Sequence, residues 1–266
     1  MGNVLKKVGI GIIIIIGILL IIILIIFIIN KIKLKQESNL FRPLGKMVTV
    51  NKHQMHVYTE GKGEVTLVFM AGGGTCSPTL DFRSLYSRLS DNYRIAVVEK
   101  AGYGFSETVD ILRDIDTVLE ETRKALILAG EKAPYVLVPH SISGIEALYW
   151  AKKYPDEITA IVGLDPAVPA AYENFQMPNK VVLNLSAFAA KIGLTRFIPS
   201  ICNSSAAIKY GSLTDNEKQI YKAIFYRKTA TKTMLNECIS MTFSCVNPNK
   251  RLKHEIPLRN SNLLQI

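Results

Sequence analysis

The chain has 266 residues and a formal charge of +10, which is enough length for one large domain or two small ones. Much of the positive excess flanks an apolar segment near the N-terminus, and no basic patch interleaved with aromatic residues follows, so we expect no nucleic-acid partner. The four cysteines have no metal-like spacing and are too few for a disulfide framework, so we expect free, mostly buried thiols, no metal and no cofactor.

The first segment is a candidate membrane anchor. Residues 8–30 carry no charge and lie between Lys7 and Lys31, and a helix of that length covers a hydrocarbon layer of roughly 30 Å. A cleaved signal peptide has a shorter apolar core, and a soluble core helix has a polar stripe, so both alternatives are disfavoured. We predict a single-pass membrane protein whose first helix lies in the lipid bilayer.

The orientation of this anchor stays open. Five basic residues between positions 31 and 46 follow the apolar segment, whereas two lysines and the terminal amine precede it. The positive-inside rule then favours a cytoplasmic body. A short N-terminus with two lysines is also how a signal anchor with an external body begins.

The residues after a polar linker predict a mostly parallel sheet flanked by helices. KMVTV and HQMHVYTE alternate around Asn51-Lys52, which indicates a hairpin. Four apolar runs are typical of strands buried on both faces, at 65–70, 94–99, 135–138 and 160–164. Helical patterns lie between these runs, over LDFRSLYSRLS, DIDTVLEETRKALILAG and SGIEALYWAKKY. This alternation predicts the α/β class, with six core strands by residue 164.

Beyond Pro166 the pattern changes to helices alone. The longest predicted helix spans 213–241, where Thr214 caps the start and Glu217 completes a capping box. We therefore predict a helical cap on an α/β core. The expected organisation is an anchor at 1–34, a linker at 35–45, the core at 46–169, the cap at 170–247 and a C-terminal remnant of the core at 248–266.

The stretch VPHSISG, residues 138–144, places Ser141 at a tight corner between a strand and a helix. A strained backbone at such a corner lifts the hydroxyl clear of the sheet and directs a helix N-terminus at the reacting group. Pro139 and Ser143 occupy the positions where glycine is usual, so the GxSxG pattern is met loosely. The alternative is that Ser141 only caps the helix.

Two glycine-rich stretches accompany this corner. AGGGT at 71–75 directly follows a buried strand, and its glycines let backbone N–H groups approach a ligand closely. It is not a phosphate loop, because no Gly-Lys-Ser/Thr follows it. GYGFSE at 102–107 lacks the third glycine of a dinucleotide-binding fingerprint.

Together these segments resemble the α/β-hydrolase family of lipases, esterases and peptidase-like enzymes. LVFMAGGGT resembles the oxyanion-loop strand of that family, VVEKAGYGFSE resembles its D-x-R-G-x-G-x-S segment, and LVPHSISGIEALYWAKKYPDEI resembles the nucleophile elbow with its helix. The resemblance covers about residues 47–168. It implies Ser141 as the nucleophile and the backbone N–H groups of Gly73 and Ile142 as the oxyanion hole. The implied reaction is acyl transfer on an ester or amide, with a small molecule or peptide as substrate.

A serine nucleophile also needs a base, and that base needs an orienting acid. In the resembled family the acid follows strand six or seven and the histidine follows strand eight, for which residues 248–266 are too short. Asp165 at the end of strand six is a candidate acid, although an aspartate before proline also forms turns. His254 is a weak candidate for the base. His140 is expected to point away from the serine hydroxyl.

Two hypotheses therefore remain. One is a membrane-anchored serine hydrolase, and the other is a degenerate or truncated homologue without catalysis. We expect the last core strand to have an exposed edge, unless the tail LLQI covers part of it. The sequence leaves the substrate and the oligomeric state open.

Overall fold

A computed structural model of the chain describes residues 2–169, 179–246 and 263–265. Its centre is a seven-stranded sheet with the order β1-β2-β4-β3-β5-β6-β7. Only β2 pairs in the antiparallel sense, with β1 and β4, and the other neighbours in the described sheet are parallel. The strands are β1 (Lys46–Val50), β2 (His53–Glu60), β3 (Thr66–Met70), β4 (Arg94–Glu99), β5 (Tyr135–Ser141), β6 (Ile158–Pro166) and β7 (Leu263–Gln265).

The predicted strands and hairpin are confirmed. Every residue of β3 is buried, as a strand covered on both faces requires. Asn51 and Lys52 join β1 to β2 with φ values of 47° and 71°. Two left-handed residues in a two-residue loop match the right-handed twist of the strands that they connect. The tail strand β7 pairs with β6, with Leu263 opposite Ile161, so the expected exposed edge is partly covered.

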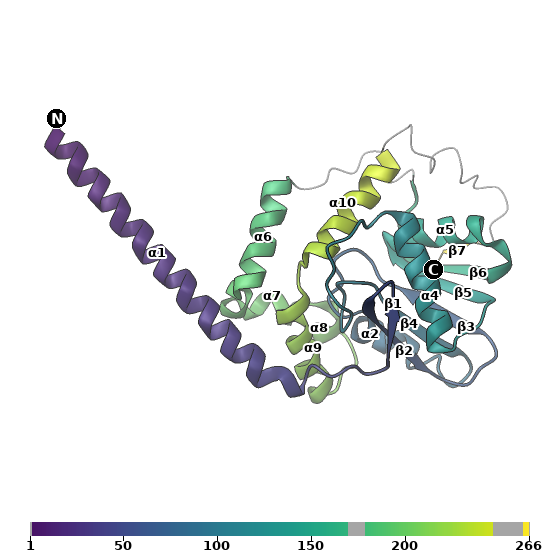
Figure 1. Cartoon of the computed structure of the whole chain (residues 1–266). Helices are drawn as coiled ribbons and strands as arrows, with labels where there is room; N and C mark the ends of the chain where they lie inside the picture. Colours follow the sequence, from purple (N-terminus) through teal and green to yellow (C-terminus); the bar gives the residue numbers. More distant parts are fainter. Residues whose placement is uncertain (1, 170–178, 247–262, 266) are drawn as a thin grey trace.

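Helices cover both faces of the sheet (Figure 1). On one face, α4 (Ile115–Ala129) and α5 (Ser143–Lys153) contribute Leu126 and Trp150 to the larger core cluster. Asp114 caps α4 by accepting a hydrogen bond from the Thr117 amide. On the other face, α2 (Pro78–Asp81) and α3 (Arg83–Tyr86) pack against β3 and β4.

The helical pattern over LDFRSLYSRLS corresponds to two short helices, α2 and α3, rather than to one continuous helix. Phe82 lies between α2 and α3 with φ −87° and ψ −3°, outside regular helical geometry. Phe82 and Tyr86 both contact Phe69 of β3, with ring centroids 5.3 and 6.0 Å apart.

The predicted helical cap is present over the described residues 180–246. It contains α6 (Lys180–Ile192), α7 (Pro199–Asn203), α8 (Ala206–Lys209), α9 (Asp215–Lys228) and α10 (Lys232–Val246). The capping box of Thr214 and Glu217 is confirmed. The single helix predicted over 213–241 was wrong, because Ala230 has a φ of 51° and separates α9 from α10. The Thr231 hydroxyl then accepts the Met234 amide and starts α10.

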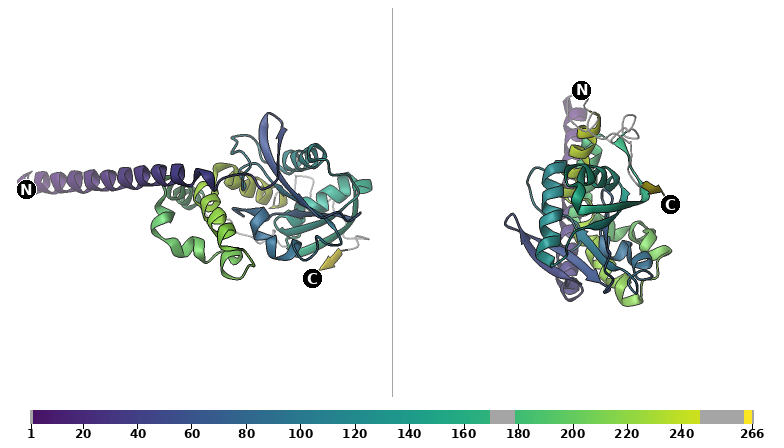
Figure 2. Two further views of the ribbon diagram at one scale, coloured as in Figure 1. Left: turned by 90° about the horizontal axis from the view of Figure 1, so that it is seen from below. Right: turned by 90° about the vertical axis from the view of Figure 1, so that its right-hand side faces the viewer.

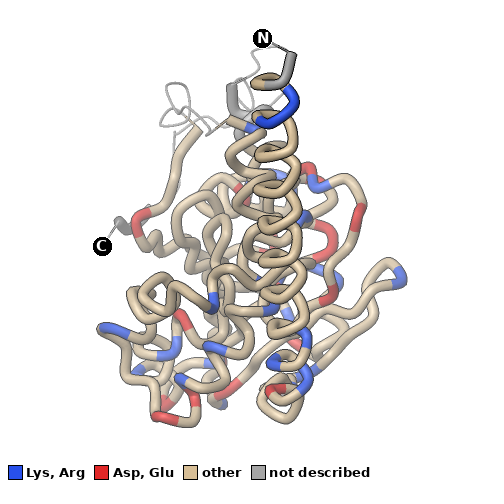
Figure 3. The backbone as a smooth tube through the Cα atoms, turned by 90° about the vertical axis from the view of Figure 1, so that its left-hand side faces the viewer, with Lys and Arg blue, Asp and Glu red and all other residues tan. Residues whose placement is uncertain are grey.

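The N-terminal helix α1 (Gly2–Gln36) is long and apolar enough to span a membrane. It projects from the rest of the molecule in Figures 1 and 2. Figure 3 shows basic residues at its two ends and none between them. The helix reaches Gln36, so the predicted linker at 35–45 begins inside it.

The last turns of α1 are tied to the cap. Asn30 is only 2% exposed, its amide donates to the Lys191 carbonyl over 3.4 Å, and its oxygen accepts from Arg196 over 2.7 Å. Arg196 also forms two hydrogen bonds with the Glu37 carboxylate, and Arg227 contacts the same carboxylate. The anchor and the cap are therefore joined by a partly buried polar network.

Candidate active site

Ser141 lies at the corner where β5 ends and α5 begins. Its φ is 53°, a left-handed conformation that is uncommon outside glycine. Ile142 occupies the N-cap position of α5 and forms no side-chain cap bond, so Ser141 does not cap this helix. The strained turn presents a half-buried serine at the carboxyl edge of the sheet.

Ser143 fills a position where the usual pattern has glycine, and its hydroxyl braces the turn. It lies 2.7 Å from the Met70 carbonyl and 2.8 Å from the His140 carbonyl, and it accepts the His140 amide over 2.9 Å. These contacts connect the corner to β3. Gly144 follows, and a Cβ at that position would collide with the Ala167 carbonyl, so glycine allows α5 to pack against the end of β6.

The glycine bend meets this corner. A Cβ built on Gly72 would lie 3.0 Å from the Cβ of Ser141 and 2.9 Å from Nδ1 of His140, and a Cβ on Gly73 would lie 3.5 Å from Ile142 Cγ2. The amides of Gly73 and Ile142 donate to no acceptor among the described residues. Gly73 and Ile142 therefore lie close to each other at this corner, and each has a backbone donor without a partner in the described parts of the chain.

None of the histidines in the described residues hydrogen-bonds to Ser141. His53 pairs with Glu121 at 3.5 Å and His56 with Glu99 at 3.0 Å, and all four side chains are buried. The Gly45 amide donates to Nε2 of His56 over 2.8 Å, and Nδ1 faces Glu99, so both ring nitrogens of His56 already have structural partners. His140 is exposed. The candidate base His254 lies outside the described residues.

Asp165 lies at the same edge of the sheet as Ser141. Its neighbour Pro166 stands opposite Ser141 in the β5–β6 register. Asp165 has a φ of 47° and is exposed. Within the described part of the chain it forms no hydrogen bond or ion pair, so the arrangement identifies no partner for a catalytic acid there.

A buried ionic network that the sequence analysis missed lies beneath the glycine bend. Lys100 Nζ is 2.7 Å from Glu146 of α5 and 2.5 Å from Glu237 of α10. Burial alone would lower the pKa of Lys100, but the two carboxylates outweigh it and raise that pKa. Tyr103 donates to Glu237 over 3.0 Å and accepts the Gly74 amide over 3.4 Å. In the sequence, the feature that could have indicated this network was Lys100, a charged residue directly after the buried strand β4.

The segment after β4 is shaped around another buried carboxylate. Glu99 accepts the Phe105 amide over 2.7 Å and the Thr79 amide over 3.2 Å. Burial raises the pKa of Glu99, but His56 and these donors outweigh it, so the pKa is lowered overall. A side chain at Gly104 would collide with the Glu99 carboxylate, which explains the second glycine in GYGFSE.

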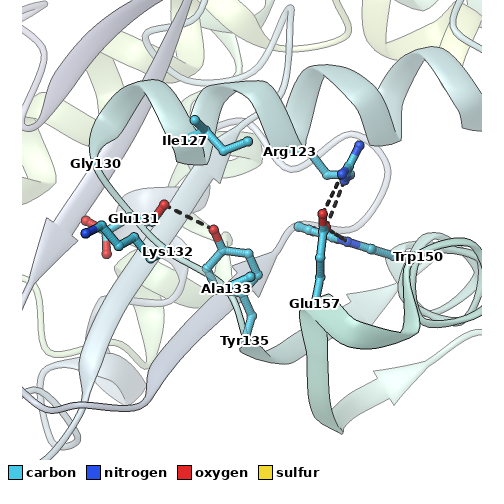
Figure 4. Close-up of a pocket in the computed structure, with 9 residues that line it drawn as sticks. All are labelled: Arg123, Ile127, Gly130, Glu131, Lys132, Ala133, Tyr135, Trp150 and Glu157. Atoms are coloured by element: carbon cyan, nitrogen blue, oxygen red, sulfur yellow. Dashed lines mark hydrogen bonds and ion pairs between the residues drawn. The ribbon is translucent and has the colours of Figure 1, made fainter.

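The cavity in Figure 4 lies at the opposite end of the sheet. It has a volume of about 360 Å³ and is lined by residues that include Tyr135, Trp150 and Glu157. Tyr135 begins β5 and Ser141 ends it, a separation of roughly 20 Å along an extended strand. Arg123 and Trp150 both donate to Glu157 at its wall, so these polar groups already have structural partners.

Comparisons with known proteins agree with this architecture. No model of a known protein family matches the chain. The chain is 46% identical over 209 residues to the uncharacterized protein YbdG of Bacillus subtilis (strain 168), covering 78% of this chain and 64% of that protein. The chain thus spans less than two thirds of this relative's length.

Two solved structures superpose on most of the chain. An esterase (EaEST) from Exiguobacterium antarcticum gives a TM-score of 0.58 at 16% identity, over 84% of this chain and 80% of the other. An N-formylmaleamic acid deformylase from Pseudomonas putida S16 gives 0.56 at 15% identity, over 83% and 80%. Likeness at these identities is a likeness of fold.

Proposed function

The chain has the α/β-hydrolase fold, and we propose that it is a membrane-anchored serine hydrolase acting on an ester or amide through Ser141. The hydroxyl oxygen attacks the substrate carbonyl, and the new oxyanion accepts hydrogen bonds from the Gly73 and Ile142 amides. The leaving group departs with a proton, and water then releases the acyl group from the serine.

One observation carries this proposal: a strained serine and two unused amides share one edge of the sheet. The left-handed φ of Ser141 has no role in capping α5. The amides of Gly73 and Ile142 are preorganised donors, and loss of one such donor typically lowers kcat by about a hundred-fold or more. Strain and open donors at one point are typical of a reaction site.

A second candidate function is binding without catalysis. It is favoured by a specific observation: the Ser141 hydroxyl forms no hydrogen bond with a base in the described part of the chain. Without a base, the serine stays a weak nucleophile at neutral pH. In the hydrolase proposal, His254 is the candidate for this base and Asp165 the candidate for the orienting acid.

Retention of the anchor is supported by its contacts with the cap. Asn30 and Glu37 supply acceptors to Arg196, which is mostly buried. Removal of α1 would leave this guanidinium without the Asn30 acceptor and would detach the chain that holds Glu37 in place, which is unfavourable for a buried charge. We propose that α1 stays part of the working protein as a single membrane span.

A fluorophosphonate probe separates the two functions. An activated serine displaces fluoride and forms a covalent bond to phosphorus, so the full-length protein in detergent is expected to become labelled. Ser141→Ala should lose all labelling. Ser38→Ala, which changes an exposed serine on the turn after α1, should label as the unaltered protein does. Absence of labelling in folded protein would favour the binding function.

A further inference from the structure

The cap helix α6 has an apolar surface that is open to its surroundings. Val181, Val182, Leu185 and Phe188 follow helical spacing, and each is more than half exposed. The charged residues of α6 are Lys180 and Lys191, one at each end, and the helix has no acidic residue. A helix with an apolar face and basic ends is typical of the interface between lipid headgroups and acyl chains.

This surface lies beside the anchor. Figure 1 shows one end of α6 close to the C-terminal half of α1. Asn30 of α1 contacts Lys191 in the last turn of α6 and Arg196 just after that helix. If α1 spans a bilayer, α6 is held at the depth where the apolar segment ends. The exposed side chains of α6 then continue the apolar surface of α1.

A cavity of about 530 Å³ opens between these elements. Its walls come from the end of α1, from α6, from the end of α9 and from the connection into α10. Among the described residues, four cationic side chains and no acidic side chain line it; the cations are Lys31, Lys191, Arg227 and Lys232. Asn30, Asn184 and three threonines add uncharged polar groups.

Two of these cations are available to a ligand. Arg227 is close to Glu37 at 3.5 Å, and Lys232 is paired with Asp110 at 2.5 Å. Lys31 and Lys191 are exposed and form no ion pair in the described parts of the chain. Lys31 is also the first charge after the apolar segment of α1, which places it at the level of lipid phosphates in a spanning helix.

We propose that this cavity binds the phosphate headgroup of an anionic membrane lipid through Lys31 and Lys191, while α6 lies in the membrane interface. The inference rests on the proposed function only in its membrane anchor. It places the cap of the molecule against the lipid surface.

The depth of α6 is tested with the full-length protein in lipid nanodiscs. A fluorophore is attached at Leu185→Cys and its quenching by bromine-labelled phosphatidylcholine is measured, with Leu128→Cys on α4 as the matched exposed control. We expect strong quenching at position 185 and none at 128. Equal, weak quenching at both positions would overturn the proposal. Cross-linking between copies at position 185 would also overturn it, because the face would then be a protein interface.

The headgroup site is tested by thermal unfolding in nanodiscs with and without phosphatidylglycerol. The anionic lipid should raise the Tm of the unaltered protein by roughly 5 °C or more if the site is saturated. Lys31→Gln/Lys191→Gln should lose most of this rise. Lys62→Gln/Lys132→Gln removes the same amount of positive charge from exposed positions elsewhere. This control variant should keep the full rise in Tm. An equal loss in both double variants would overturn the site.

Two further arms complete the test. Inorganic phosphate added to neutral nanodiscs distinguishes a lipid from a free anion: an equal rise in Tm with phosphate alone would overturn the assignment to lipid. All measurements are repeated with Ser141→Ala, and neither readout needs catalysis. If the protein is not a hydrolase, the quenching and Tm results are therefore unaffected. If the lipid site is absent, the fluorophosphonate labelling of Ser141 is likewise unaffected.

Discussion

At the scale of single residues, the turn at Ser141 depends on a neighbouring hydroxyl. Ser143 joins the corner to β3 through the Met70 carbonyl and closes the turn on His140. A glycine at this position, as in the usual pattern, has no side chain to form these bonds. Ser143 therefore stabilises the turn through hydrogen bonds, whereas the glycines of the usual GxSxG pattern allow the turn to pack tightly.

Ser143→Ala is predicted to destabilise the protein by about 1–3 kcal/mol, because buried backbone groups lose their partner. It should also slow labelling of Ser141 by the fluorophosphonate, because the strained turn relaxes. Thermal unfolding and a labelling time course measure the two effects, with Ser38→Ala as the control. Unchanged stability and labelling would show that the hydroxyl does not brace the turn.

A second residue-scale prediction concerns Asp81, beneath the cap. Burial raises the pKa of Asp81 to about 7, although Tyr221 donates to one of its oxygens over 3.1 Å. A carboxyl with a raised pKa stabilises the fold fully below its unfolded pKa, near 4, and this stabilisation is lost as the pH rises through 7. Each pKa unit corresponds to about 1.4 kcal/mol, so the loss is at most about 4 kcal/mol.

Asp81→Asn should remove this pH dependence. The difference in unfolding free energy between the unaltered protein and the variant should change by up to about 4 kcal/mol between pH 4 and pH 8, in favour of the variant at pH 8. Unfolding of both proteins at several pH values measures this difference. A difference that stays constant with pH would mean that folding does not raise the pKa of Asp81.

At the scale of elements, the strands and the hairpin were predicted because their signals are local. A continuous apolar run indicates β3, and Asn51-Lys52 between alternating segments indicates a two-residue turn. The division between α9 and α10 has no such signal. Ala230 is a strong helix former, and the break is fixed by contacts of Thr231 with the Gly102 carbonyl and of Thr233 with Val109.

At the scale of elements, Ala230→Gly is predicted to stabilise the protein, whereas the same substitution at an ordinary helix position destabilises it. Alanine at a φ of 51° is strained by about 1–2 kcal/mol, and glycine relieves this strain while gaining freedom in the unfolded chain. We expect a change between zero and about 1 kcal/mol of stabilisation. Ala189→Gly inside α6 should instead destabilise by about 1 kcal/mol. Thermal unfolding of both variants measures the two changes. Equal destabilisation would contradict the idea that Ala230 is strained between α9 and α10.

At the scale of the whole molecule, the candidate nucleophile and oxyanion donors could be predicted, whereas the ionic network around them could not. Ser141 and Ile142 belong to one short stretch, and Gly73 follows a recognisable strand. Lys100, Glu146 and Glu237 come from three distant segments, and only the fold brings them together. The polar contacts of Asn30 with the cap were missed for the same reason.

The Lys100 network holds three parts of the molecule together: the loop after β4, the elbow helix α5 and the cap helix α10. Lys100→Met leaves Glu146 and Glu237 facing each other without the cation between them, and among the described residues only Arg113, 3.7 Å from Glu237, remains as a nearby buried positive charge. Breaking a buried pair in this way typically costs about 3–5 kcal/mol. The same change at Lys218, which pairs with Asp215 on the exposed surface of α9, should cost less than about 1 kcal/mol.

The pH dependence of this variant distinguishes the network from simple packing. Facing carboxylates raise each other's pKa, so the lost stability of Lys100→Met should be partly recovered as the pH falls and one carboxyl takes a proton. Lys100→Met/Glu237→Gln should recover part of it at pH 7 as well, because only one of the two facing carboxylates then keeps its charge. Urea unfolding at pH 7 and pH 5 measures both effects, and a loss no larger than that of Lys218→Met would show that the network does not hold the cap on the core.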